Sequence, residues 1–214
     1  MSFRPPPSQA LSIDGAVGAL QALLEEPAGA LGAGYAVVCH PHPLYGGTMQ
    51  NKVVHTVARA CQEAGLPTLR FNYRGVGASA GSYDEGRGET QDALAVIAWA
   101  QARWPQAALT LAGFSFGAMV SLQAAAVVPP RRLISVAPAV ANPEFAAIER
   151  PRCPWLILQG DADELVDYRA VQAFAARFEP PPQLQLLPGA EHFFHGRLQD
   201  LRAAVLAFLD EEAR

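Results

Sequence analysis

The sequence predicts an α/β protein with a mostly parallel central sheet and helices on both of its faces. Two observations carry this prediction. Short apolar runs with little alternation recur along the chain, which is typical of parallel strands covered on both faces. Segments with helical apolar spacing lie between these runs, and alternating strands and helices imply right-handed crossovers within one sheet. The chain has 214 residues, so we expect one domain over 1–214.

Each element has its own signal in the sequence. Strands are expected at six apolar runs: 35–40, 67–73, 108–114, 132–138, 154–160 and 184–189. Helices are expected at 51–65, 89–104, 117–127, 168–178 and 196–214. Gly65 and Pro67 mark the end of the first helix. Segment 11–24 allows two interpretations: an edge hairpin that turns at Asp14-Gly15 or at Gly18, which we favour, and a helix that begins at Val17.

The composition argues against several classes of protein. Half of the residues are apolar, 17% are charged and the net charge is −4, which favours neither disorder nor a nucleic-acid partner. The N-terminus lacks the apolar core of a signal peptide and no long uncharged apolar run follows, so we expect a cytoplasmic protein with no membrane partner. The three cysteines, Cys39, Cys61 and Cys153, are widely spaced in apolar surroundings, which predicts buried reduced thiols.

One serine stands at the junction of a predicted strand and a predicted helix. Gly113-Phe114-Ser115-Phe116-Gly117 fits the G-x-S-x-G pattern, in which the serine occupies a strained turn and the glycines let strand and helix approach closely. A serine hydroxyl needs a base to remove its proton and a carboxylate to orient that base. Ser115 is therefore predicted to be a nucleophile, provided that the sequence supplies both partners.

The sequence supplies both partners after the serine. Asp161 and Asp163 follow a predicted strand directly, at the sheet edge where open α/β folds collect functional residues. His192 and His195 lie on the loop after the last predicted strand. The chain order is thus serine, acid, histidine, with two candidates for each of the last two roles.

Three further motifs give the chain a family resemblance. The segments "HPHPLYGG", "RFNYRGVGASAG" and "GDADELV" resemble signatures of the small, lidless bacterial α/β-hydrolases. The resemblance covers nearly the whole chain and implies the α/β-hydrolase fold without a cap domain. It also implies that Asp163 is the acid, with Asp161 a turn carboxylate, and that His192 is the base, with His195 flanking the final helix.

The resemblance also implies an oxyanion hole. In α/β-hydrolases one backbone N–H comes from the residue after the nucleophile, here Phe116, and the other from the loop after an early strand. Pro41 and Pro43 have no N–H, so His42 is the expected second donor and Leu44 is the alternative. The imidazoles of His40 and His42 could brace this loop or line the site.

Two motifs permit other interpretations that we consider weaker. His40-x-His42 could hold zinc, but the Asp-His that usually follows in such metallohydrolases is missing. The glycine-rich segment 74–81 could bind a phosphate, but it lacks the spacing and the lysine of phosphate loops. We therefore expect neither a metal nor a cofactor.

The expected activity is hydrolysis of a small-molecule ester. The stretch between 138 and 154 is too short for a helical lid, so the site should be open, with apolar walls. The candidate wall residues are Leu44, Tyr45, Phe116, Phe145 and Phe193. A serine carboxylesterase with an acyl-enzyme intermediate is the first expectation. The alternatives are a thioesterase, a peptidase or lipase with the same triad, and a non-catalytic binding protein.

Overall fold

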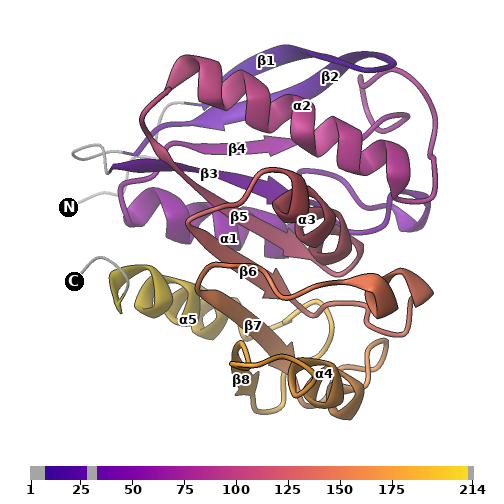
Figure 1. Cartoon of the computed structure of the whole chain (residues 1–214), viewed down its shortest axis with the longest axis vertical. Helices are drawn as coiled ribbons and strands as arrows, with labels where there is room; N and C mark the ends of the chain where they lie inside the picture. The colour runs from indigo at the N-terminus through magenta and orange to yellow at the C-terminus, as the bar shows by residue number, and fades with distance from the viewer. Residues whose placement is uncertain (1–7, 28–32, 212–214) are drawn as a thin grey trace.

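A single twisted sheet of eight strands forms the centre of the protein. The computed structural model describes residues 8–27 and 33–211. The strand order across the sheet is β1-β2-β4-β3-β5-β6-β7-β8, and every pair from β4 to β8 is parallel (Figure 1). The strands are β1 (Ser8–Gly15), β2 (Gly18–Glu25), β3 (Gly34–Cys39), β4 (Thr68–Phe71), β5 (Ala108–Phe114), β6 (Arg132–Val136), β7 (Trp155–Gly160) and β8 (Gln183–Leu187).

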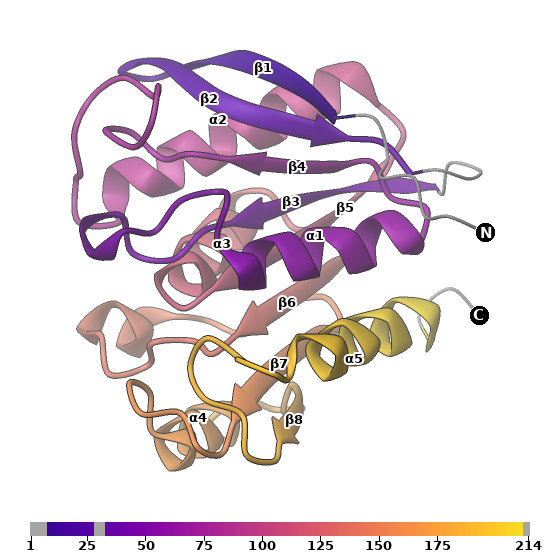
Figure 2. The same ribbon diagram turned by 180° about the vertical axis from the view of Figure 1, so that it is seen from behind.

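Helices cover both faces of the sheet, as predicted. They are α1 (Lys52–Glu63), α2 (Arg87–Arg103), α3 (Phe116–Val127), α4 (Tyr168–Ala175) and α5 (Leu198–Glu211). The side chains of α2, α3 and α4 join one buried apolar cluster, and those of α1 and α5 join another. Figure 1 shows α2 and α3 in front of the sheet, and Figure 2 shows α1 and α5 on the opposite face. The sheet is therefore buried on both faces, which explains the continuous apolar runs.

The hairpin interpretation of the N-terminal segment is confirmed. β1 pairs with β2 in antiparallel register from Ser8 opposite Glu25 to Gly15 opposite Gly18. The backbone of Gly18 has a φ of +125°, a conformation that residues with a side chain rarely adopt. β2 in turn pairs antiparallel with β4, so the hairpin closes one edge of the parallel sheet.

No cap domain covers the sheet between β6 and β7. This connection lies wholly within the described residues, and its one helical element is the 3₁₀ turn Pro143–Ala147. The three cysteines are buried and unpaired. No helix within 8–27 and 33–211 is long and apolar enough to cross a bilayer.

Candidate active site

Ser115 occupies a sharp turn between β5 and α3. Its backbone has φ 55° and ψ −115°, a strained conformation for a residue with a side chain. The Ser115 N–H donates to the carbonyl of Val136 on the neighbouring strand, at 2.8 Å. A Cβ on Gly113 would lie 2.0 Å from the carbonyl oxygen of Gly117, and one on Gly117 would lie 2.4 Å from that of Cys39. Both glycines are thus required by the close approach of strand and helix.

Replacement of Gly117 by alanine is expected to destabilise the fold. The new methyl group would overlap backbone atoms of Cys39 and His40, which cannot move as a side-chain tip can. We expect the free energy of unfolding in urea to fall by about 2–4 kcal/mol. Gly196→Ala is the matched control: its Cβ meets nothing within 4 Å and its φ is +71°, so only backbone strain of about 1 kcal/mol should be seen. Equal losses in the two variants would contradict the overlap.

The carboxylate of Asp163 lies in the loop after β7 and is fully enclosed. Its Oδ2 is 2.9 Å from His192 Nδ1 and accepts from Gln159 Nε2 at 2.9 Å. Its Oδ1 accepts the backbone N–H groups of Leu165 and Val166, at 2.9 and 2.8 Å. Burial raises the pKa of this carboxyl, but the hydrogen bonds from His192 and the two backbone groups outweigh it and lower the pKa below its ordinary value. Asp163 is therefore held as an anion facing His192.

The imidazole of His192 lies between this carboxylate and the cavity that contains Ser115. Only 3% of His192 is exposed, and its ring packs 5.0 Å from the ring of Phe114. Ser115 and His192 both line a cavity of about 500 Å³. No hydrogen bond joins the two side chains among the described contacts, and in hydrolases this contact often tightens only once substrate is bound.

The alternative acid and the alternative base lie elsewhere. Asp161 Oδ1 accepts the backbone N–H of Gly189 at 2.6 Å, which makes it a loop-bracing carboxylate. The side chain of His195 is 67% exposed and lies 3.4 Å from the Glu191 carboxylate. The structure thus pairs Asp163 with His192 and brings neither Asp161 nor His195 to the cavity.

Two backbone N–H groups near Ser115 have no acceptor among the described residues. Phe116 is the first residue of α3, where N–H groups lack intrahelical partners. His42 lies in the loop after β3 and lines the same cavity. The N–H of Leu44, the alternative oxyanion donor, is directed instead to Nδ1 of His42, at 3.2 Å. This bond disfavours Leu44 as the oxyanion donor.

The cavity walls match the expected set only in part. Tyr45, Phe116 and Phe145 line the cavity, whereas Leu44 and Phe193 do not. Leu44 is 66% exposed, and Phe193 packs against the rings of Phe114 and His192. Five lining residues were not among the expected walls, and they come from α3, the β6–β7 connection and the loop after β7: Met119, Ala139, Asn142, Leu165 and Val166. Leu165 and Val166 lie within "GDADELV", which was used to select the acid, whereas no motif contains Met119, Ala139 or Asn142.

The chain resembles known proteins in both sequence and structure. Residues 19–150 match the X-Pro dipeptidyl-peptidase (S15) family. The chain belongs to the S15 family of α/β-hydrolases. The matched range includes Ser115 and the loop after β3 but ends before Asp163 and His192.

Individual relatives of this S15-family chain extend the match to nearly its full length. It is 45% identical to an α/β serine hydrolase homologue from Coxiella burnetii, with a TM-score of 0.91 over 96% of this chain and 99% of that one. It is also 45% identical to a lidless α/β serine hydrolase from Xanthomonas campestris, with a TM-score of 0.92 over 99% and 97%. An uncharacterised Rickettsia prowazekii protein is 35% identical over 81% of this chain and 77% of its own length. The protein is therefore a lidless hydrolase of the serine type.

In this S15 hydrolase His40 braces the loop and does not line the cavity. The ring is fully buried. Its Nδ1 lies 2.6 Å from the carbonyl oxygen of Pro41, and its Nε2 accepts the backbone N–H of Tyr73 at 3.2 Å. His42 uses both of its ring nitrogens as well, with Leu44 and Tyr83. Neither imidazole offers a free nitrogen, so the zinc interpretation has no support in this geometry.

The buried His40 predicts a pH-dependent stability. Burial lowers its pKa from 6.5 to about 4, so below pH 6.5 the unfolded chain binds a proton at this ring that the folded protein does not bind. Stability is thus lost as pH falls. Between about pH 7 and about pH 4.5 we expect a loss of roughly 2–3 kcal/mol in the free energy of urea unfolding from this group.

His40→Gln isolates that contribution. The pKa values of His42 and His55 are also lowered, mainly by burial, so the wild-type slope contains several groups. The difference between the wild type and His40→Gln across the same pH range belongs to His40. Parallel curves for the two proteins would contradict the assignment.

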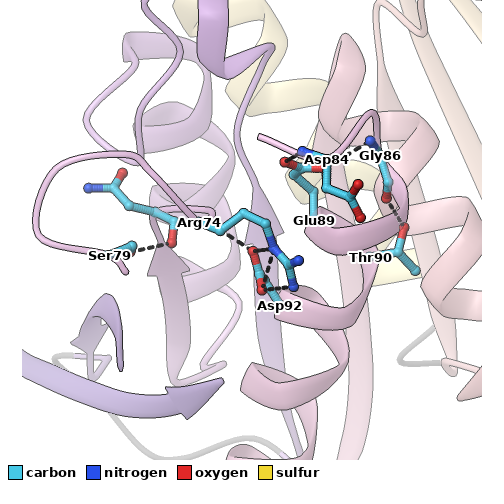
Figure 3. Close-up of polar contacts among 8 residues, drawn as sticks. Arg74, Ser79, Asp84, Gly86, Glu89, Thr90 and Asp92 are labelled. Carbon is cyan, nitrogen blue, oxygen red and sulfur yellow. Dashed lines mark hydrogen bonds and ion pairs between the residues drawn. The ribbon is translucent and has the colours of Figure 1, made fainter. Parts of the chain in front are cut away.

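In this S15 hydrolase the arginines of the segment "RFNYRGVGASAG" form buried ion pairs that join neighbouring elements. Arg70 donates to the carboxylate of Glu25 on the hairpin at 2.8 Å and to the carbonyl of Met49 at 2.6 Å. Arg74 donates to the buried carboxylate of Asp92 on α2, with a shortest distance of 2.8 Å (Figure 3).

The glycine-rich part of this segment closes on itself rather than forming a ligand cradle. Ser79 Oγ donates to the carbonyl of Asn72 at 2.7 Å (Figure 3), and Ser79 Oγ accepts the N–H of Gln21 at 2.9 Å. Gly75 and Gly77 have φ values of +73° and +58°, which the turns require. These contacts explain the glycines without a phosphate and leave the phosphate-loop interpretation unsupported.

Proposed function

We propose that this protein hydrolyses small neutral carboxylic esters through Ser115, His192 and Asp163. The observation that carries the proposal is the convergence of Ser115 and His192 on one cavity, with His192 Nδ1 held 2.9 Å from the Asp163 carboxylate. In this reaction His192 Nε2 takes the proton of Ser115 Oγ while that oxygen attacks the ester carbonyl. The backbone N–H groups of Phe116 and His42 stabilise the oxyanion that forms.

The second half of the reaction returns the enzyme to its starting state. His192 donates the proton to the departing alcohol oxygen as the tetrahedral intermediate collapses to an acyl-Ser115. A water molecule then gives a proton to His192 and attacks the acyl carbonyl, and Ser115 leaves with that proton as the carboxylic acid is released. Asp163 stays ionised throughout, in keeping with its lowered pKa, and stabilises the imidazolium in both steps.

Family membership makes a peptidase the competing proposal. An X-Pro dipeptidyl-peptidase must bind the protonated amino terminus of its substrate, and a buried ammonium group needs a carboxylate partner. The cavity lining consists of apolar and aromatic residues with Asn142, Ser115 and two histidines, and no aspartate or glutamate of the described residues lines it. This lining favours a neutral ester over a dipeptidyl substrate.

A substrate panel tests the two proposals against each other. The panel comprises p-nitrophenyl esters from acetate to palmitate and Gly-Pro-p-nitroanilide. We expect turnover of the shorter esters, because an open cavity of about 500 Å³ suits small ligands, and no measurable turnover of the anilide. Two results together would favour a peptidase over an esterase: cleavage of the anilide, and ester turnover no higher than that of Ser115→Ala.

A further inference from the structure

The imidazole of His42 makes two polar contacts that the proposed reaction does not use. Its Nδ1 accepts the backbone N–H of Leu44 at 3.2 Å, and its Nε2 lies 3.2 Å from the hydroxyl oxygen of Tyr83. A neutral imidazole carries one proton. Because Nδ1 is the acceptor, that proton is on Nε2 and is donated to Tyr83.

The ring is also held by aromatic packing. Its centroid lies 4.7 Å from that of Tyr45, 5.1 Å from that of Tyr83 and 4.8 Å from that of Phe116. Burial lowers the pKa of His42, which favours the neutral ring that an acceptor at Nδ1 requires. Orientation and protonation state are therefore both fixed by the surroundings.

The backbone that follows Tyr83 is held by a buried carboxylate. Glu89 on α2 is fully buried, and it accepts the backbone N–H groups of Asp84 at 3.0 Å and Gly86 at 2.8 Å (Figure 3). A Cβ on Gly86 would lie 2.6 Å from Met119, a lining residue of the cavity. The segment that follows Tyr83 is thus hydrogen-bonded to α2, and at Gly86 it passes close to the cavity residue Met119.

These contacts determine which N–H groups of the loop remain available. The carbonyl of His42 accepts the N–H groups of Tyr45 at 3.2 Å and Gly47 at 3.0 Å. The N–H of Leu44 is bound to the imidazole and Pro43 has none. Of the backbone N–H groups of residues 42–45, only that of His42 has no acceptor among the described residues.

We propose that the His42 imidazole is a positioning residue, which caps the turn at Pro43–Tyr45 and, held by Tyr83, aims the backbone N–H of His42 at the oxyanion. The inference rests on the proposed ester hydrolysis and adds to it a side chain that acts through its own backbone. It gives the second histidine of "HPHP" a role distinct from that of the first, which braces the loop from inside the core.

Three variants separate this role from simple packing. His42→Phe keeps a ring but has no acceptor for the Leu44 N–H. His42→Asn removes the ring but supplies an oxygen acceptor, and asparagine is a strong helix-capping residue. Tyr83→Phe keeps the aromatic contact and removes the hydroxyl. The assay measures kcat and KM for p-nitrophenyl butyrate, with kcat expressed per site titrated by a fluorophosphonate, so that misfolded protein does not count.

The expected pattern is a selective loss of kcat. His42→Phe should lower kcat by about 10- to 100-fold with KM within about twofold, since a misaimed donor weakens only the transition state. His42→Asn should stay within about fivefold of the wild type, and Tyr83→Phe should fall between the two.

Three results would overturn the inference. If the wild type is active and His42→Phe matches its kcat, the positioning role is wrong. Equal losses of kcat in His42→Phe and His42→Asn would also rule it out. Either result would leave the proposed ester hydrolysis standing. A wild type no more active than Ser115→Ala would overturn the proposed function and this inference with it.

Discussion

Replacement of Ser115 by alanine is expected to lower kcat for p-nitrophenyl butyrate by at least about 10⁴-fold. The methyl group cannot form the acyl intermediate, and the oxyanion donors alone leave only a small residual rate enhancement. The fold should be unaffected, because no hydrogen bond of the Ser115 hydroxyl is among the described contacts and the turn is fixed by its backbone bond to Val136. The measurement is steady-state hydrolysis with a thermal melt of each protein.

Ser12→Ala is the matched control for this prediction. Ser12 is an exposed serine on the edge strand β1, so its removal should leave both kcat and melting temperature unchanged. A nucleophilic role would be contradicted if a folded Ser115→Ala protein kept a tenth or more of the wild-type kcat, a loss of about 10-fold or less.

Replacement of Asp163 by asparagine is expected to lower kcat by about 10³- to 10⁴-fold. In the wild type the backbone N–H groups of Leu165 and Val166 bind Oδ1. In the variant they would bind the amide oxygen, which leaves the amide nitrogen facing His192. An amide N–H facing Nδ1 favours the imidazole tautomer protonated at Nε2, which cannot accept the proton of Ser115. KM should change little, because Asp163 does not line the cavity.

Asp161→Asn is the natural comparison, since the two aspartates are separated by one residue. Among the described contacts the carboxylate of Asp161 binds only the N–H of Gly189, and an asparagine oxygen can accept the same bond. We expect kcat within about threefold of the wild type. The reverse ranking of the two variants would move the acid role to Asp161.

Most of the fold could be predicted because its signals are local. The parallel strands are buried on both faces, so their apolar runs stand out in the sequence, and β5 was bounded correctly at 108–114. The hairpin at 8–25 was harder to distinguish from a helix, because its outer strand is largely exposed and carries few apolar residues in alternation. Some helix ends differ from the prediction by one to three residues, for example α4, which ends at Ala175 instead of 178, whereas α3 ends at Val127 as predicted.

The candidate site, like the fold, could be predicted only in part. Ser115, Asp163 and His192 were selected by motifs and by the strands they follow, and the placement of Asp163 beside His192 is consistent with that selection. Met119 and Leu165 could not be recognised as lining residues, although Leu165 lies within "GDADELV", because folding brings them to the cavity from segments 46 residues apart. The pairing of Arg74 with Asp92 is likewise a contact in space that neither residue signals alone.

The central claim, that Ser115 is an activated nucleophile, is tested most directly by covalent labelling. The wild type, Ser115→Ala and Asp163→Asn are each incubated with a fluorophosphonate, and the modified peptide is located by mass spectrometry. We predict one adduct on Ser115 in the wild type, none in Ser115→Ala, and labelling slowed by at least about 100-fold in Asp163→Asn. An unlabelled wild type, or an adduct on another residue that persists in Ser115→Ala, would contradict the claim.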